Sequence, residues 1–293
     1  MANRFTRKFK NFLKYHFYIL KVYRKFSPEV QIAQRQLFHY YQECARSGNI
    51  PALSDTGFRV FTQFEEDGIL LFLFAVVGTR NKTFVEIGSD DGVNSNCANL
   101  VLNLRWHGLF IDADKSSIRR GRHFYRKYPT HWSYPPKFLC NRVTRENINQ
   151  LIADAGFTGE VDFLCIDIDG NDYWIWDTLQ IISPRVVMIE THVEFGYHNI
   201  VVPYDPDYTY PGRHPVYHGA SPVAMNQLAN RKGYRLVGAN SHGFNAIFVR
   251  NNVGTVILPE VPVKSILQHP ATIDSFKLFE PIKDWEYITE HVT

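Results

Sequence analysis

Residues 83–92 read TFVEIGSDDG, and they decide the fold of this chain. The first five predict a buried strand that contains Glu86, and the loop after it has glycines at Gly88 and Gly92. A helix-forming stretch follows, and then a second apolar run, LFIDAD (109–114), ends in carboxylates. This succession predicts a nucleoside pocket, because loop glycines let the backbone approach a ligand and a strand-end acid accepts hydrogen bonds from ribose hydroxyls.

The glycine spacing indicates which nucleoside the pocket takes. A dinucleotide fingerprint, G-x-G-x-x-G, binds a pyrophosphate at a helix N-terminus, whereas this loop has two glycines four residues apart. The loop also contains Asp90 and Asp91, two carboxylates that would repel a pyrophosphate and tolerate a cation. S-adenosylmethionine carries a sulfonium and an ammonium group and has no phosphate. The loop therefore favours S-adenosylmethionine over NAD as the cofactor.

Beyond this pocket, apolar strand-like runs alternate with helical patterns. The predicted strands cover residues 83–88, 109–113, 137–140, 161–168 and 185–191, and the helices between them cover 94–106, 115–127, 145–155 and 171–180. Such alternation predicts a parallel sheet covered by helices on both faces. Two later strands, 234–238 and 245–250, are separated by a gap short enough for a hairpin, so the last strand should run antiparallel.

This order of elements resembles the class I S-adenosylmethionine-dependent methyltransferase fold. That fold is a Rossmann-like α/β fold with a doubly wound, seven-stranded, mostly parallel sheet and an antiparallel last strand. The expected parts are a basic amphipathic helix over 1–26, a helical lead-in over 27–60, the methyltransferase domain over 61–252 and a tail over 253–293 packed on the body.

Composition and charge limit the partners. Residues 1–26 hold eight Lys/Arg and no acid, which leaves 24 basic and 29 acidic residues, a net charge of −5, for the rest of the chain. A mildly acidic body argues against nucleic acid as a partner. The four cysteines form no C-x-x-C pair, which suits a reducing compartment such as the cytoplasm. Residues 1–26 are too polar to span a bilayer, and they predict either a helix on an anionic membrane surface at the inner face or a helix packed on the body or a partner.

Polar residues cluster at the predicted carboxyl ends of the strands, where ligands bind in open α/β sheets. The residues expected to contact the cofactor are Glu86, Gly88, Ser89, Asp90, Gly92, Asp112, Asn141 and Asp167. Asp112 is assigned to the ribose, with Asp114 as the second candidate, and Asn141 or its backbone to the adenine edge. The aromatic segment 172–176 and the Tyr/His-rich loop 192–220 suit a sugar acceptor, since aromatic rings stack on the C–H faces of sugars.

Methyl transfer to an alcohol needs a general base or a bound cation, because an unactivated hydroxyl has a very high pKa. Asp169 or His192 would take the proton, and Asp167, Asp169 and Glu190 would supply oxygen ligands to Mg²⁺. Structural roles compete with these assignments. Asp167 would then only cap the helix near residue 171, and Glu190 would pair with an arginine such as Arg142 or Arg185.

The motifs together resemble the FkbM-type methyltransferase family. They are TQFEEDGIL (62–70), VEIGSDDG (85–92), LFIDAD (109–114), VDFLCIDIDGNDYWIW (161–176), VVMIE (186–190) and GYRLVGANSHGFNAIFVR (233–250). The resemblance implies S-adenosylmethionine-dependent O-methylation, often in the biosynthesis of cell-surface polysaccharides or glycosylated natural products. By position it places Glu86, Gly88 and Gly92 in the cofactor loop. Asp112 and Asp169 each stand where the family usually has a glutamate, which keeps the charge and shortens the reach.

The sequence thus predicts an O-methyltransferase that acts on a sugar hydroxyl of a polysaccharide, glycolipid or related glycan. Two alternatives remain open at this stage. One is an N-methyltransferase, although the N/D-P-P-Y-like motif common in such enzymes is replaced here by IDIDG (166–170). The other is a cofactor-binding scaffold of a membrane-associated biosynthetic complex that has no catalytic activity.

Overall fold

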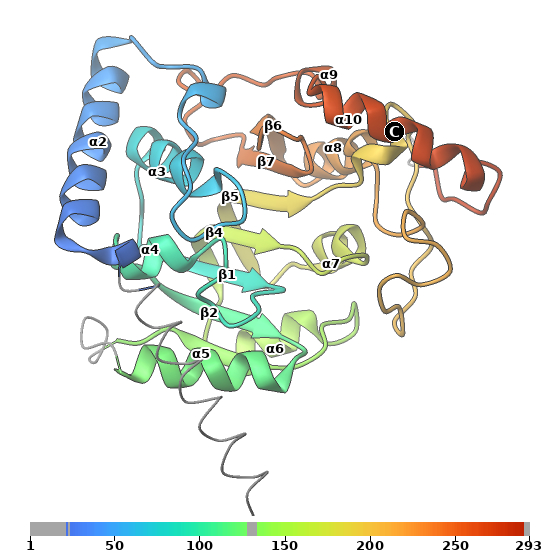
Figure 1. Cartoon of the computed structure of the whole chain (residues 1–293), viewed down its shortest axis with the longest axis horizontal. Coiled ribbons are helices and arrows are strands. Elements are labelled where there is room, and N and C mark those ends of the chain that lie inside the picture. The colour runs from blue at the N-terminus through green and yellow to red at the C-terminus, as the bar shows by residue number, and fades with distance from the viewer. Residues whose placement is uncertain (1–21, 23, 128–133, 290–293) are drawn as a thin grey trace, which may run out of the picture.

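The computed structural model describes residue 22 and residues 24–127 and 134–289, which form a seven-stranded sheet between two layers of helices (Figure 1). The strands are β1 (Thr83–Ile87), β2 (His107–Asp112), β3 (Lys137–Cys140), β4 (Gly159–Ile166), β5 (Ile182–Glu190), β6 (Tyr234–Ala239) and β7 (Asn245–Arg250). Their order is β3-β2-β1-β4-β5-β7-β6. The first five are parallel, and β7 pairs antiparallel with both β5 and β6. This confirms the predicted class I methyltransferase, Rossmann-like fold.

Helices cover both faces of the sheet. They are α2 (Pro28–Ser47), α3 (Glu66–Val77), α4 (Ala98–Leu102), α5 (Lys115–Lys127), α6 (Ile148–Asp154), α7 (Asp172–Thr178) and α8 (Pro222–Arg231). Residues on the same strand alternate between two cores. Phe84 packs with α3 and α4, whereas its neighbour Val85 packs with α6, α7 and α8. This period of two along a buried strand is what sandwiches the sheet between helices.

Helix α3 is the most buried helix of the layer that packs on the Phe84 side of the sheet. Its residues Ile69–Val76 are apolar on every side and are all buried, as expected for a helix with no solvent-facing side. Helix α2 covers it, with the ring of Tyr41 edge-on to Phe72 at 5.1 Å between centroids. Helix α2 begins at Pro28 and ends before Gly48, whose φ of 77° suits a glycine C-cap.

A buried ion pair fixes the start of β1. Asp162 on β4 is fully buried, and it accepts a 2.9 Å hydrogen bond from Arg185 Nη1. It also accepts hydrogen bonds from the backbone N–H groups of Arg80, Asn81 and Lys82, at 2.7–3.0 Å. Burial of a carboxylate is tolerated when its oxygens are satisfied in this way. The network sets the register of β1, and through it the position of the glycine loop.

Helix α4 differs most from its prediction. It covers residues 98–102, not 94–106. Glu86 on β1 accepts hydrogen bonds from the backbone N–H groups of Asn96 and Cys97, at 2.9 and 3.1 Å. This side chain holds the segment before α4 in turns. That segment therefore lines the site instead of forming the first turns of the helix.

The last described residues pack on the loop after β5. They form short helices, α9 (Val263–Ile266), α10 (Pro270–Ser275) and the 3-10 helix η5 (Phe276–Ile282). A small separate core joins Phe195 to Phe279 and Ile282. Further along, Ile288 pairs with Val201 in an isolated antiparallel bridge. The far end of the chain therefore braces the loop that the sequence assigns to the acceptor.

Most of the basic segment 1–26 lies outside the described residues, so its membrane contact stays a prediction. Within it, Val22 is buried and Arg24–Phe26 forms the 3-10 helix η1. Asn103 Nδ2 donates a 3.2 Å hydrogen bond to the carbonyl of Lys25. In the part of the chain that the structure describes, no helix combines the length and the apolarity needed to cross a bilayer.

Candidate functional site

Two adjacent cavities with a common wall open at the carboxyl ends of the parallel strands. The β2 cavity, of about 520 Å³, is lined by Asp112 and Asn141. The β5 cavity, of about 460 Å³, is lined by Glu190 and His192. The residues that line both are Gln63, Gly88, Asn94, Asp167, Asp169 and Tyr210. Ligands bound in the two cavities would therefore meet at this shared wall.

Asp112 is the strand-end acid of the β2 cavity. It ends β2, and its two oxygens accept hydrogen bonds from the backbone N–H groups of Asp90 and Asp114, at 2.8 and 2.7 Å. Burial raises the pKa of Asp112, and these hydrogen bonds oppose the shift. Asp114, the second candidate for the ribose, instead accepts hydrogen bonds from Ser116 and Ser117 at the start of α5. Asp112 lines the cavity and Asp114 does not.

Only part of the predicted glycine loop faces the cavities. Gly88 lines both, and a Cβ at this position would lie 1.6 Å from the carbonyl oxygen of Asp167, so only glycine fits. Gly92 packs against aromatic rings, with Phe110 and Phe138 3.0–3.1 Å from the position of a Cβ. Ser89 is buried and lines neither cavity. These two residues shape the turn without reaching the ligand space.

The two loop aspartates differ. Asp90 lines the β2 cavity, whereas Asp91 is buried outside it and accepts hydrogen bonds from the N–H groups of Val93 and Asn94. Both pair with Arg120 of α5, at 3.1 Å from Asp90 and 3.6 Å from Asp91. The positive charge of Arg120 therefore offsets much of the repulsion that the two aspartates are expected to exert on a pyrophosphate.

Glu86 lines the β5 cavity rather than the β2 cavity. Besides the two backbone N–H groups described above, its Oε2 accepts a 2.7 Å hydrogen bond from Ser95 Oγ. Complete burial raises the pKa of Glu86 to about 7, and these hydrogen bonds limit the shift. Glu86 thus acts mainly by holding the wall formed by residues 94–97.

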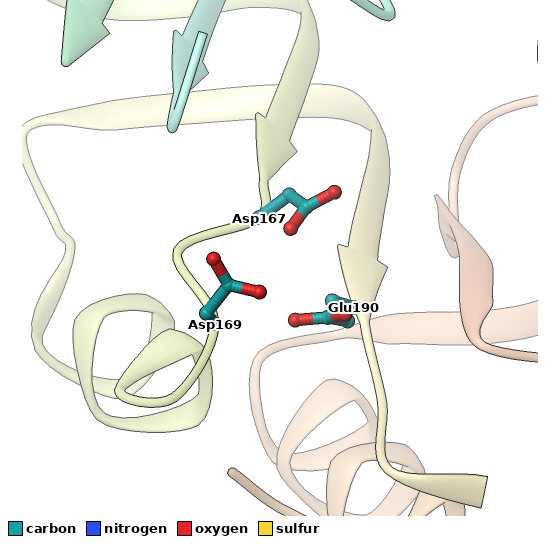
Figure 2. A group of neighbouring side chains, drawn as sticks. All are labelled: Asp167, Asp169 and Glu190. Carbon is teal, nitrogen blue, oxygen red and sulfur yellow. The ribbon is translucent and has the colours of Figure 1, made fainter. Parts of the chain in front are cut away.

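Three carboxylates converge where β4 and β5 end (Figure 2). One oxygen from each of Asp167, Asp169 and Glu190 lies within 4.8 Å of the other two. We call these residues the carboxylate trio. Burial, reinforced by neighbouring carboxylates, raises the pKa of Asp167 to about 8 and that of Glu190 well above its usual range. Asp169 has a φ of 56°, an uncommon conformation for a residue with a side chain, and such strain often marks functional sites.

The competing structural roles are filled by other residues. Asp172, not Asp167, accepts the hydrogen bonds of the N–H groups of Ile168 and Gly170 before α7. Arg185 pairs with Asp162, and Arg142 donates to the carbonyls of Pro206 and Tyr208. Neither arginine pairs with Glu190. Among the described residues, the trio therefore faces the cavity without the helix-capping and arginine partners that the structural roles would require.

His192 borders the trio on the Glu190 side. Its Nε2 lies 4.0 Å from Glu190 Oε2, and its Nδ1 lies 3.9 Å from Glu194 Oε2. Burial, followed by the neighbouring His218, lowers the pKa of His192 well below its usual range. The imidazole is therefore neutral at neutral pH, which is the state that can accept a proton.

Sequence reasoning missed several lining residues. Gln63, Asn94 and Tyr210 line both cavities, and His218 lines the β5 cavity. Tyr210 and His218 belong to the Tyr/His-rich loop that the sequence assigns to the acceptor, whereas Gln63 and Asn94 were not predicted. Trp176 is buried against Phe248, as expected for a core residue.

Comparisons with known proteins give low similarities. No protein-family model and no curated protein matches the sequence. Among solved structures, an O-methyltransferase from Bacillus cereus in complex with S-adenosylhomocysteine (SAH) is 13% identical, with 72% of this chain and 88% of that chain covered and a TM-score of 0.40. An O-methyltransferase of tomaymycin synthesis from Streptomyces achromogenes is 14% identical, with 73% and 89% covered and a TM-score of 0.40. Since these scores are low, the function rests on the residues of the site.

Proposed function

We propose that this chain is an S-adenosylmethionine-dependent O-methyltransferase that acts on a sugar hydroxyl of a polysaccharide, glycolipid or related glycan. One observation carries the proposal. The cavity that contains the strand-end acid Asp112 meets the cavity that contains Glu190 and His192 at a common wall. A methyl donor and an acceptor hydroxyl would be brought together at that wall, next to groups able to remove a proton.

The β2 cavity fits the cofactor in size and chemistry. Its volume of about 520 Å³ lies within the usual range of small-molecule sites, roughly 300–1,000 Å³. Asp112 would accept hydrogen bonds from the ribose hydroxyls, and Asn141 would read the adenine edge. S-adenosylmethionine supplies an electrophilic methyl group on a sulfonium when it is bound.

The β5 cavity suits an uncharged acceptor. Six carboxylates line it, and no Lys or Arg is among its lining residues. No Lys or Arg among the described residues is there to bind a phosphate or carboxylate, whereas a sugar hydroxyl can form hydrogen bonds with the acids. Phe64, Tyr210 and Phe244 add aromatic surface. The resemblance to the FkbM-type family supports the same class of acceptor.

His192 is the best-placed group to accept the hydroxyl proton, because it is neutral and borders the shared wall. Asp169 is the second candidate. Asp167, Asp169 and Glu190 would offer oxygen ligands to a divalent cation such as Mg²⁺, which would lower the pKa of a bound hydroxyl.

Calorimetric titration with SAH tests the proposal. We expect micromolar binding, at least tenfold weaker for Asp112→Ala. The matched control is Asp114→Ala, two residues away and outside the cavity, which should bind like the wild type. No binding at millimolar SAH, with binding of NAD instead, would overturn the proposal. Turnover on glycan acceptors that survives Asp169→Ala and His192→Ala would contradict the assigned proton acceptors.

A further inference from the structure

Among the described residues, no Lys or Arg pairs with the carboxylate trio, and its nearest basic group is the imidazole of His192. Its carboxylates come from the ends of two adjacent strands, and Figure 2 shows them directed toward one another. Arg142 and Arg185, which the sequence suggests as partners of Glu190, are engaged elsewhere. Arg185 pairs with Asp162, and Arg142 donates hydrogen bonds to backbone carbonyls. Three acids that converge without a Lys or Arg repel one another when they are ionised, and a bound cation would relieve that repulsion.

The spacing of the trio suits a single ion. Ligands about 2.1 Å from an ion lie about 3.0 Å apart when adjacent and about 4.2 Å apart when opposite. The three oxygens are within 4.8 Å of one another, so a small inward movement brings them to coordinating distance. Asp169 is exposed and can make that movement.

A nitrogen donor stands next to the Glu190 carboxylate, on one side of the trio. The residue His192 is only 7% exposed, and its Nε2 has no hydrogen-bond partner among the described residues. The same is true of Glu190 Oε2, which lies 4.0 Å away. Two buried polar atoms that face each other without partners are costly to keep in a fold. Both would be satisfied by an ion between them.

A second imidazole lies beside the first. His218 is 6% exposed, its Nδ1 has no hydrogen-bond partner among the described residues, and its ring centroid is 3.9 Å from that of His192. Gly219 follows it, and a Cβ there would lie 2.1 Å from Cδ2 of His192. The missing side chain leaves room for the ring of His192 next to the trio.

We propose that Asp167, Asp169, Glu190 and His192 bind a divalent first-row transition-metal ion in preference to Mg²⁺. Mg²⁺ prefers oxygen ligands and keeps several waters, whereas imidazole nitrogen favours the transition metals, with affinity rising from Mn²⁺ through Fe²⁺ to Co²⁺. This inference refines the proposed function, because the ion would lie where the acceptor hydroxyl meets the shared wall. With His192 Nε2 bound to the ion, the second carboxylate oxygen of Asp169 would accept the hydroxyl proton.

Calorimetric titration of the full chain with Co²⁺ and with Mg²⁺ tests the inference. We expect Co²⁺ to bind at least tenfold more tightly than Mg²⁺. Substitution His192→Ala should weaken Co²⁺ binding about tenfold and change Mg²⁺ binding less than twofold, and Glu190→Gln should weaken both. His198→Ala, an exposed histidine of the same loop, is the matched control and should change neither.

Three results would overturn the inference. The first is equal affinity for Co²⁺ and Mg²⁺. The second is no Co²⁺ binding up to about 1 mM, which corresponds to a binding free energy of only about −4 kcal/mol. The third is Co²⁺ binding that His192→Ala leaves unchanged, which would place the ion elsewhere. The SAH titration of the same samples separates the two proposals. SAH binding without Co²⁺ binding removes only the metal, and Co²⁺ binding without SAH binding removes only the methyltransferase.

Discussion

Glu86 combines two roles that are usually separate. Its carboxylate lines the β5 cavity, and it also holds the N–H groups of Asn96 and Cys97 in the segment before α4. It is also 98% buried, which penalises its charged form. The stability of the protein should therefore depend on the protonation of this side chain.

The substitution Glu86→Gln tests this dependence. Native Glu86 has a pKa of about 7, above its usual value of 4.5, so between these pH values the folded state binds more protons than the unfolded state. The contribution of Glu86 to stability is then largest below pH 4.5 and is lost as pH rises to 7. Urea unfolding measures this change. Between pH 4.5 and pH 7.5 the free energy of unfolding of the wild type should fall by up to about 3 kcal/mol more than that of Glu86→Gln. An equal difference at both pH values would contradict the assigned pKa.

Gly219 controls the position of His192. Its φ is 69°, and an added Cβ would meet the imidazole edge at 2.1 Å. We expect Gly219→Ala to abolish methyl transfer, since the ring must move, while SAH still binds in the other cavity. The control is Gly233→Ala, which has a similar φ of 82° and no neighbour within 4 Å, and which should cost only about 1 kcal/mol of backbone strain. Equal activity in the two variants would refute a catalytic role for His192.

The residues of the site divide by how the sequence encodes them. Asp112, Asp167 and Glu190 could be predicted, because each ends an apolar run and parallel strands end at one edge of the sheet. Gln63 could not, since it comes from a segment with no strand or helix period, and the Tyr/His-rich loop indicated His218 only through its composition. The positions of these residues in the site depend on where the chain folds back, which local sequence patterns do not encode.

Arg142 is one of several side chains that hold the loop over residues 203–213. Arg142, after β3, donates to the carbonyls of Pro206 and Tyr208, and Tyr208 lines the β2 cavity. Asn171 Nδ2 adds a 2.7 Å hydrogen bond to the carbonyl of Asp205. The loop therefore closes one side of the proposed cofactor site.

We expect Arg142→Ala to release this loop and to weaken SAH binding about tenfold, the effect of losing one or two charge-assisted hydrogen bonds. Calorimetry measures the affinity, and limited proteolysis reports the loop. Arg119→Ala, an exposed arginine of α5, is the matched control. If both variants bind SAH like the wild type, the loop is not part of the cofactor site.

The elements themselves show what local sequence can fix. Helix α5 and strand β3 have the bounds that the sequence predicts, because amphipathic or apolar periodicity continues to their ends. Helix α4 is shorter than predicted, and Glu86, ten residues before Asn96, holds the turns that stand in place of its expected first residues. Such a long-range contact overrides local propensity.

At the scale of the whole molecule, residues 253–289 extend the acceptor side. Trp285 packs edge-on to Tyr217 with 4.8 Å between ring centroids, and Arg213 lies over its ring at 4.7 Å. Tyr217 Oη also donates a 2.6 Å hydrogen bond to the carbonyl of Glu286. The sequence could only suggest that this tail packs on the body, since its short helices show no period.

We expect Trp285→Ala to lower the free energy of unfolding by about 1–3 kcal/mol, through lost aromatic and cation–π contacts. Trypsin should then cut faster at Arg213, which loses the nearer of its two ring partners, Trp285 at 4.7 Å, and keeps Tyr217 at 5.7 Å. Leu278→Ala on η5, whose side chain is largely exposed, provides the control. Unchanged cleavage at Arg213 would show that the loop is held by other contacts.

The bridge between Val201 and Ile288 has a consequence for biosynthesis. The two partners are 87 residues apart in the chain, so at about 5–20 residues per second the ribosome needs roughly 4–17 s to deliver the second after the first. The parallel strands that carry Gly88 and Asp112 leave the ribosome well before that time. The part of the site that would hold the nucleoside can therefore form during translation. The acceptor wall is complete only after Ile288 has been synthesised and has paired with Val201.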